Sequence, residues 1–435
     1  MSFIYPQELE ARIAATCDRL AKSGIKPRDR IAILAPNSVE QIILLFSLWR
    51  LKAVACPLNL YQPKAIIKKQ MAHINARMLL NERSVKKLVA VKNASSSLFF
   101  NHMSSDQPCT ILFTSGSSAG PKAALHSVGN YYHNALASNK VLNLKEGDRW
   151  LLSLPLYHVG GLSILWRCYL AKAAVVVPQN REEAMRSMAR DEITHVSLVP
   201  TQLYRLLQRP QKYPSLKCML VGGAPIPKNL IQQAIKRHWP IYTTYGLTET
   251  TSQIATAKQG NGARILPCIR VKISPDAEIL VKGKSLFCGY VEGKRVRLPL
   301  TKDGWFNTND LGAIKGRRLI VKGRKDNQFI SGGENIQPEE IEQHLITLKG
   351  VAQACIVPQT DAEYGERPVA FVKFEASKIP RRKIEDFLKS RVARYKLPDD
   401  FYAWPLKTRD DESKMPRKLL QQCIKRDGRK LLRIT

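Results

Sequence analysis

Hydrophobic residues along the first 250 positions form short runs that alternate with longer segments of helical spacing. The run at 31–34 is short and rich in β-formers, the segment 38–51 is apolar at helical spacing, and the run at 53–56 is short again. This order is typical of β–α–β units. The pattern returns later, with expected strands at 150–154, 173–177, 195–199, 218–221 and 241–244. Continuous apolar strands are typical of buried parallel sheets covered by helices, which we therefore expect.

The pattern changes near residue 264 and again near residue 326. Short β-rich runs with turn residues follow residue 264, and a new α/β pattern, with expected helices at 337–348 and 381–392, follows Asp326. We predict an α/β fold with a large N-terminal domain of stacked α/β sheets and a small C-terminal α+β domain. The predicted bounds are 1–325 for the first domain, with a β subdomain at about 264–325, and 326–435 for the second. The polar, basic segment 86–97 is predicted to be a loop.

The charge of the chain narrows the choice of partners. There are 69 Lys and Arg residues against 36 Asp and Glu, a net charge of +33 over 435 residues. Such a balance suggests a polyanion such as nucleic acid. The cations are nevertheless spread along the chain, and no basic run is interleaved with aromatic residues. We expect no specific nucleic-acid partner and an attraction for phosphorylated small molecules. Weak contact with an anionic membrane and a homo-oligomer stay open.

Cysteine and histidine usage points to a cytoplasmic protein. The nine cysteines are scattered without a C-x-x-C pair, and the eight histidines show no close ligand pair. This usage is typical of a reducing compartment and of a protein without structural zinc. The first residues lack the pattern of a signal peptide, and the apolar segment 42–49 is too short to span a bilayer. We therefore expect a cytoplasmic location.

A loop rich in glycine and hydroxyl groups follows the apolar run 110–113. It contains Thr114, Ser115, Gly116, Ser117, Ser118 and Lys122. Glycines let backbone N–H groups turn inward, hydroxyls add donors and a lysine adds a positive charge, which together suit phosphate. The loop is not a Walker A motif, because Lys122 is followed by Ala123 and the metal-binding hydroxyl is missing. Taken alone, a flexible Ser/Gly loop explains the stretch equally well.

Four further features point to a nucleotide. The segment 221–225 follows an expected strand, and its small residues let a flat ring approach the backbone. The segment 245–249 offers an aromatic ring, a hydroxyl and the carboxylate of Glu249, which is a candidate for the missing metal ligand. Asp310 suits a ribose diol, and Arg324 suits the same sugar or a phosphate. Each has an ordinary structural explanation, such as a cap, a surface carboxylate or a core ring. Their joint occurrence in this order indicates an ATP site.

These motifs resemble those of the adenylate-forming superfamily of acyl-CoA synthetases, luciferases and peptide-synthetase adenylation domains. The family's T-S-G-T-T-G-x-P-K is matched at 114–122 except for Ala119, and its Y-G-x-T-E is matched in full at 245–249. Its W-x-x-T-G-D corresponds to 305–310 with Asn309 in the glycine position, and its G-R-x-D hinge to 323–326. The resemblance runs from about residue 30 to residue 417.

The resemblance implies an enzyme that uses ATP, Mg²⁺ and CoA in two steps. A substrate carboxylate attacks the α-phosphate of ATP to give an acyl-adenylate and pyrophosphate, and the mobile C-terminal domain then rotates about Asp326 to admit the CoA thiol. Carried over by position, Glu249 binds Mg²⁺. The implied ATP-binding residues are Thr114, Ser115, Gly116, Ser117, Ser118, Lys122, Gly223, Ala224, Pro225, Tyr245, Gly246, Thr248, Asp310 and Arg324. The implied CoA-binding residues are Ser331, Gly332 and Gly333.

The implied catalytic residues are Lys414, Thr248, Glu249 and His158. Lys414 matches the lysine of the family's G-K-x-x-R, with Ser413 in the glycine position and Arg417 following. A lysine on a mobile domain can bridge the carboxylate and the α-phosphate as charge develops and then withdraw. The ordinary alternative is a solvated lysine in a basic tail.

The acid is suggested by the segment 154–162, which the resemblance places at the acyl pocket. Together with 121–126, 163–167 and 331–336, it resembles the o-succinylbenzoate–CoA ligases of menaquinone synthesis. The residues implied at the substrate are His158, Gly160, Gly161, Arg167 and Gly246. The alternatives are a CoA ligase for another aromatic or medium-chain acid and a catalytically decayed basic binding protein on the same scaffold.

Overall fold

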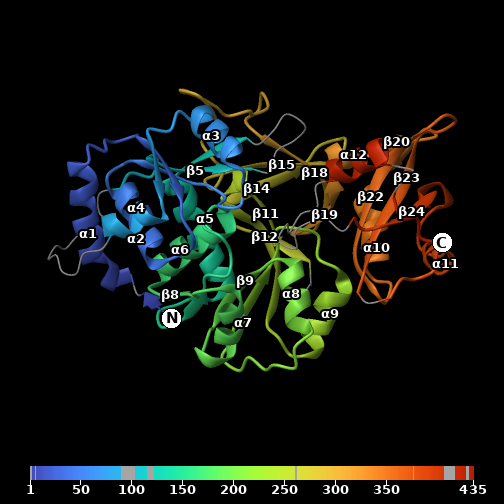
Figure 1. Ribbon diagram of the computed structural model, residues 1–435, viewed down its shortest axis with the longest axis horizontal. Helices are drawn as coiled ribbons and strands as arrows, with labels where there is room; N and C mark the ends of the chain where they lie inside the picture. The colour runs from blue at the N-terminus through green and yellow to red at the C-terminus, as the bar shows by residue number, and fades with distance from the viewer. Residues whose placement is uncertain are drawn as a thin grey trace.

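Three β-sheets with covering helices make up the molecule (Figure 1). The computed structural model describes residues 2–4, 6–89, 103–114, 122–259, 262–375, 377–405, 417–427 and 431–435. Two sheets and most helices form a large N-terminal domain, and the third sheet belongs to a smaller C-terminal domain at the right of Figure 1. The predicted α/β class with a large and a small domain is therefore confirmed. The exact boundary at residue 326 stays a prediction.

The first sheet has twelve strands and runs through the whole N-terminal domain. In sheet order they are β1 (Ser2–Ile4), β8 (Ala174–Val177), β7 (Arg149–Leu151), β9 (His195–Leu198), β10 (Cys218–Val221), β11 (Ile241–Leu247), β12 (Ser252–Lys258), β13 (Ala263–Ile265), β19 (Arg318–Arg324), β18 (Phe306–Lys315), β15 (Glu278–Gly283) and β14 (Ile269–Ile273). Strands β8, β7, β9, β10 and β11 are parallel, as the apolar runs predicted. From β11 onward the pairing is antiparallel, so the expectation of parallel sheets holds only for part of the molecule.

The second sheet has seven strands and is also mixed. In sheet order they are β17 (Arg295–Arg297), β16 (Gly289–Glu292), β6 (Ala123–Ser127), β5 (Pro108–Phe113), β3 (Val54–Pro57), β2 (Arg30–Leu34) and β4 (Met78–Asn81). Strands β5, β3, β2 and β4 are parallel, whereas β6 returns antiparallel to β5. The strand β16 comes from the predicted β-rich region and joins this sheet beside β6. Residues of β16 are thereby placed beside residues of β6, although the two strands are far apart in the sequence.

Helices form layers on both sides of these two sheets (Figure 1). The main hydrophobic core lies between the sheets and combines residues of both with residues of α1 (Pro6–Lys22), α2 (Val39–Arg50), α4 (Glu82–Val89), α5 (Val128–Leu142) and α6 (Val159–Ala171). The helix α3 (Lys64–His73) covers the other face of the seven-stranded sheet through Ile67. The helices α7 (Arg181–Arg190), α8 (Pro200–Leu207) and α9 (Lys228–Lys236) cover the other face of the twelve-stranded sheet.

The loop predicted at 86–97 is partly wrong. The helix α4 extends to Val89, and both Val85 and Val89 are buried. These two side chains are four residues apart and therefore face the same side of the helix, where α4 packs against α1 and α2. The lysines between them conceal this spacing in the sequence. Residues 90–97 lie outside the described residues.

The C-terminal domain has a five-stranded sheet with its own core. The strands are β20 (Phe329–Ser331), β21 (Glu334–Ile336), β22 (Val351–Asp361), β23 (Gly365–Phe374) and β24 (Asp400–Ala403). The helices are α10 (Pro338–Leu345), α11 (Arg381–Lys389) and α12 (Arg417–Asp427). No helix in the part of the chain that the structure describes has the length and apolar character needed to cross a bilayer.

Candidate active site

The expected phosphate loop joins two antiparallel strands. Thr114 directly follows β5 and Lys122 directly precedes β6, and the N–H of Thr114 donates to the carbonyl of Lys122 at 2.9 Å. This hydrogen bond closes the base of the loop. A Walker A loop leads into a helix instead, so the strand after Lys122 is a second difference from that motif. Ser115, Gly116, Ser117, Ser118 and Ala119 lie outside the described residues, and their contact with phosphate stays a prediction.

Three residues predicted to bind ATP form one hydrogen-bonded group. The hydroxyl of Tyr245 donates to Oδ2 of Asp310 at 2.6 Å, and Nη1 of Arg324 donates to Oδ1 of the same carboxylate at 3.1 Å. Burial and the adjacent Asp310 carboxylate raise the pKa of Tyr245 well above its usual value, so the hydroxyl keeps its proton. Asp310 is 4% exposed. The group presents a ring, a carboxylate and a guanidinium from β11, β18 and β19.

Asn309 has a clear structural role at the position where the family motif has glycine. Its φ is 57°, in the left-handed region that glycine and asparagine adopt at the lowest cost. Its N–H donates to Oε1 of the buried Glu278 at 3.0 Å. The substitution therefore preserves the backbone turn that precedes Asp310.

The small residues expected to flank adenine follow the carboxyl end of β10. This strand is parallel to β11, which carries Tyr245, so both features meet at one edge of the sheet. Gly222 is required there, because a Cβ at this position would lie 2.6 Å from Cγ2 of Thr244. Gly223 has a φ of 82°, and Pro225 is exposed. The segment 223–225, with Ala224, therefore forms an accessible backbone turn at the same edge of the sheet as Tyr245.

Thr248 and Glu249 lie on a short 3₁₀ turn, Thr248–Thr250, directly after β11. Nε2–H of His126 donates to the carbonyl of Thr248 at 2.7 Å, and the N–H of Phe287 donates to the carbonyl of Glu249 at 2.8 Å. Burial lowers the pKa of His126 to about 4, so the ring is neutral. His126 on β6 and Phe287 just before β16 therefore both fix the backbone of this turn.

Tyr290 contacts two of the predicted residues and was not itself predicted. Its hydroxyl donates to Oε1 of Glu249 at 2.7 Å, and Nζ of Lys122 lies 4.9 Å from the centre of its ring. Burial and Glu249 raise the pKa of the Tyr290 hydroxyl, which therefore stays protonated. The sequence held no signal for this contact, because Tyr290 is in an ordinary β-rich run.

Glu249 suits Mg²⁺. One carboxylate oxygen accepts the hydrogen bond of Tyr290, and no cation forms an ion pair with the carboxylate among the residues that the structure describes. These residues also contain no cluster of three or more His, Cys, Asp or Glu side chains that could hold a metal. A single protein carboxylate fits Mg²⁺, which usually keeps several waters and binds substrate phosphates. Mg²⁺ bound here would neutralise charge on the phosphates of ATP.

Arg167 lies on α6 and is buried without a carboxylate partner in the described part of the chain. Its side chain is among the largest that are fully buried, its Nη2 donates to Oγ of Ser252 at 3.1 Å, and its guanidinium lies 5.4 Å from the ring of Trp150. Its Nε has no hydrogen-bond partner. Burial lowers the pKa of Arg167 to about 10, so the side chain remains charged at neutral pH. A buried unpaired cation is costly, and a ligand carboxylate would offset this cost.

The other residues expected at the acid have separate structural roles. His158 precedes α6 and is exposed, with its ring 4.6 Å from that of Tyr157. A Cβ at Gly161 would lie 2.2 Å from the carbonyl oxygen of Pro155, and a Cβ at Gly246 would lie 1.6 Å from that of Ser252. Both glycines are therefore needed for close backbone packing. A Cβ at Gly160 would lie 3.0 Å from Cδ1 of Leu154. Contact of these residues with the acid stays a prediction.

The expected hinge and CoA residues lie at the start of the C-terminal domain. Nε and Nη2 of Arg324 donate to the carboxylate of Asp326 at 2.9 and 3.0 Å. Gly332 and Gly333 are the two loop residues of the β20–β21 hairpin, with φ of 55° and 83°, as a type I′ turn requires. Ser331 is buried, and its Oγ accepts from Arg367 at 3.2 Å. Lys414 lies outside the described residues.

Comparison with protein families defines the class. Residues 6–291 match the family described as AMP-binding enzyme, and residues 340–410 match the AMP-binding enzyme C-terminal domain. The chain therefore belongs to the family of AMP-binding enzymes. This confirms the predicted adenylate-forming superfamily and an AMP-forming acid–CoA ligase as the kind of enzyme.

Individual relatives narrow the class further. The chain is 35% identical over 410 residues to a 2-succinylbenzoate–CoA ligase of Haemophilus influenzae, with 92% of this chain and 88% of the relative covered. It is 32% identical to the ligase of the same name from Bacillus licheniformis, with 89% and 88% covered. The solved structure of o-succinylbenzoate CoA synthetase (MenE) from Bacillus subtilis with the acyl-adenylate OSB-AMP superimposes with a TM-score of 0.86 at 29% identity, covering 95% and 92%. The same protein with ATP and magnesium also gives 0.86, covering 95% and 94%.

Proposed function

We propose that this enzyme joins o-succinylbenzoate to CoA at the expense of ATP, giving o-succinylbenzoyl-CoA, AMP and pyrophosphate in menaquinone biosynthesis. The structural observation that supports this acid is the burial of the charged Arg167 side chain. This substrate has two carboxylates, so one can be activated while the other pairs with a cation. Arg167 is a buried, charged side chain without an acidic partner in the described residues. The names of the curated relatives support the same acid.

The described residues can perform the first step by positioning and by charge. Tyr245, Asp310 and Arg324 hold the nucleoside, and the ends of the loop at Thr114 and Lys122 hold the phosphates that leave. Adenylation needs little covalent help from the protein, because charge neutralisation and alignment lower most of the barrier. We propose that Thr248, on the turn after β11, contacts the α-phosphate. Lys414, which lies outside the described residues, is proposed to supply a further charge to it.

We propose that the segment 154–156 and the helix α6 position the acid. Nδ2 of Asn37, which follows β2, donates to the carbonyl of Leu154 at 2.8 Å, and Oδ1 of Asn37 accepts from the N–H of Leu156 at 2.9 Å. These bonds hold the segment that leads into α6. Arg167 then lies on α6 with its Nη2 on Ser252, whose backbone pairs with Leu247 directly before Thr248. The second carboxylate can therefore be bound on the same sheet strand pair that positions the α-phosphate.

The second step uses the C-terminal domain. We propose residues 326–435 as this domain and Asp326 as the hinge about which it turns to admit CoA. Ser331, Gly332 and Gly333 are proposed to contact CoA, because their hairpin begins only three residues after Asp326. We propose a cytoplasmic location for the enzyme.

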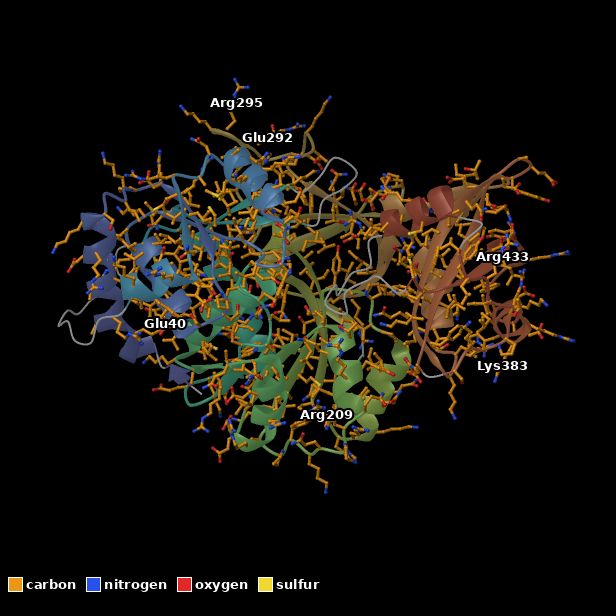
Figure 2. The ribbon with its side chains drawn as sticks, in the orientation of Figure 1. Glu40, Arg209, Glu292, Arg295, Lys383 and Arg433 are labelled. Atoms are coloured by element: carbon orange, nitrogen blue, oxygen red, sulfur yellow. The ribbon has the colours of Figure 1, made fainter. Side chains whose placement is uncertain are left out.

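A pyrophosphate-release assay with an acid panel tests the proposal. Wild type should release pyrophosphate with o-succinylbenzoate, ATP and Mg²⁺, and should form thioester when CoA is added. In Arg167→Met, kcat/KM for o-succinylbenzoate should fall on the order of a hundredfold, while the KM for ATP should change little. The control is Arg209→Met, because Arg209 is exposed and lies at the lower edge of the molecule in Figure 2.

The outcomes separate the alternatives. If benzoate or a medium-chain acid is turned over faster than o-succinylbenzoate, that acid is the substrate and the proposed one is wrong. If Arg167→Met and wild type are equally active on o-succinylbenzoate, Arg167 does not bind the acid. No pyrophosphate with any acid, together with tight and salt-sensitive binding of nucleic acid, would favour a decayed binding protein.

A further inference from the structure

Tyr290 lies between the two charged residues expected at the phosphates of ATP. Its hydroxyl contacts Oε1 of Glu249, and its ring face contacts the ammonium of Lys122. Lys122 comes from the end of the phosphate loop, whereas Glu249 comes from the turn after β11. One neutral side chain therefore contacts both the expected phosphate-binding cation and the expected metal-binding carboxylate.

The position of Tyr290 is fixed by its own surroundings. Tyr290 is on β16 and pairs with Ala124 on β6, two residues after Lys122. Its ring also meets the ring of Phe287 edge to face, with centres 4.8 Å apart. The N–H of Phe287 in turn donates to the carbonyl of Glu249. The strand pairing thus sets the distance from Tyr290 to Lys122, and the Phe287 contacts set its distance to Glu249.

Lys122 and Glu249 carry opposite charges and both contact Tyr290, so a direct ion pair between them is the obvious alternative arrangement. The described residues show none between Lys122 and Glu249; each contacts Tyr290 instead. The ring face attracts the ammonium through its quadrupole, and the hydroxyl satisfies one oxygen of the carboxylate. Neither contact removes the charge. Lys122 remains able to bind phosphate, and the second oxygen of Glu249 remains able to bind a cation.

We infer that Tyr290 is a positioning residue that orients Glu249 toward Mg²⁺ and Lys122 toward phosphate while keeping the two from pairing directly. The inference rests on the proposed function in that the phosphates are those of ATP. Hydrogen bonds to the outer atoms of a metal ligand fix its orientation, and their loss typically weakens metal binding by 10–100-fold. Removal of the ring has a second effect, because it allows Lys122 and Glu249 to collapse into an ion pair.

Two substitutions separate the hydroxyl from the ring. Mn²⁺ binding in the presence of ATP, without acid, is measured by electron paramagnetic resonance, and ATP binding without metal is measured by calorimetry. Tyr290→Phe should raise the Kd for Mn²⁺ about tenfold and leave the Kd for metal-free ATP within about twofold, because the ring stays under Lys122. Tyr290→Leu should raise both constants. In a Glu249→Gln background, Tyr290→Phe should have no further effect on Mn²⁺.

Tyr402→Phe is the matched control. The hydroxyl of Tyr402 donates to Asp400 in the C-terminal domain, so this variant also removes a hydroxyl from a carboxylate but should change neither constant. An unchanged Kd for Mn²⁺ in Tyr290→Phe overturns the inference, as does an unchanged Kd for metal-free ATP in a folded Tyr290→Leu. If Tyr290→Leu does not fold, the Kd for Mn²⁺ in Tyr290→Phe alone tests the inference. A wrong acid assignment would leave these acid-free results intact, whereas failure of wild type to bind ATP with Mn²⁺ would overturn both proposals.

Discussion

The hydroxyl of Tyr245 donates to Asp310 at 2.6 Å, although their strands β11 and β18 are four places apart in the twelve-stranded sheet. Neighbouring strands lie about 4.8 Å apart, so a flat sheet would separate these strands by roughly 19 Å. The sheet must therefore curl strongly between β11 and β18. The smaller core formed by residues such as Ile254, Ile279 and Phe306 lies inside this curled part. Curling is what brings Tyr245, Asp310 and Arg324, the proposed nucleoside-binding group, together in one place.

Arg324 bridges Asp310 and Asp326, and its replacement by lysine should weaken nucleotide binding. The guanidinium uses different nitrogens for the two carboxylates. A lysine ammonium is a single charged point and cannot reproduce this arrangement. In Arg324→Lys the Kd for AMP should rise about tenfold, which corresponds to about 1.4 kcal/mol. Calorimetry with AMP measures the change. Arg433→Lys, at the outer edge of the C-terminal domain in Figure 2, should show none.

Asn309 should accept glycine but not a β-branched residue. Its left-handed φ of 57° is available to glycine without cost, whereas valine clashes with its own backbone there. Asn309→Gly should leave the free energy of unfolding within about 0.5 kcal/mol, and Asn309→Val should lower it by about 1–2 kcal/mol. Denaturant unfolding measures both. Lys315→Val on the same strand is the control for β-branching alone, and an equal loss there would contradict the explanation by φ.

Arg417 should be a large contributor to the stability of the C-terminal domain. Its guanidinium donates to both carboxylate oxygens of Glu342, which is 12% exposed and also accepts the N–H of Ile356 at 2.7 Å. Burial raises the pKa of Glu342 despite this partner. Arg417→Met leaves a buried carboxylate unpaired, and the free energy of unfolding should fall by about 3–5 kcal/mol at neutral pH.

The pH dependence of this variant has a definite sign. Without Arg417 the folded-state pKa of Glu342 lies still further above its unfolded value, so the protonated form is favoured in the folded protein. The free energy of unfolding that Arg417→Met loses relative to wild type should therefore be smallest below the pKa of Glu342 in the unfolded chain. This loss should grow as the pH rises through the pKa of Glu342 in the folded protein. Adding Glu342→Leu should recover most of the loss, because it removes the unpaired charge. A deficit that does not depend on pH would point to lost packing instead.

His126 should make the protein sensitive to mild acid. Its folded-state pKa of about 4 lies below the ordinary value of 6.5, so the folded state resists protonation. Its contribution is present above the unfolded pKa and is lost as the pH falls from 6.5 toward 4. Between pH 8 and pH 5 this amounts to about 2 kcal/mol. Denaturant unfolding of wild type and His126→Asn at both pH values isolates the effect, because the variant should lose that much less on acidification.

The parts of the fold set by local pattern were predictable. The apolar runs that became β2, β3 and β10 are fully or mostly buried, and such strands lie between helices whatever their order in the sheet. No element was predicted before residue 30, although α1 fills positions 6–22. The order of strands and the curl were not predictable, because they depend on pairings between distant segments. β16 illustrates this, since it follows β15 in sequence yet joins the other sheet.

The grouping of residues from ordered motifs was predictable, although their binding roles stay predictions. Tyr245, Asp310 and Arg324 were chosen from three separate motifs, and the structure brings them together. Tyr290 was missed because its partner Glu249 is 41 residues away, and a single tyrosine in a β-rich run carries no local signal. The absence of a carboxylate partner for Arg167 among the described residues was equally hidden, because burial without an ion pair is a property of the packed interior.

If Asp310 holds the ribose and Asp326 is the hinge, as proposed above, the shared guanidinium of Arg324 links nucleotide binding to the orientation of the C-terminal domain. Ribose hydroxyls that bind Asp310 compete with Arg324 for that carboxylate, and the part of the guanidinium they release is free to hold Asp326 more firmly. By thermodynamic reciprocity, a rotation that draws Asp326 away must alter the affinity for nucleotide by the same factor by which nucleotide alters the rotation. Under the proposed function, the passage from adenylate formation to thioester formation would then depend on how tightly the ribose is bound.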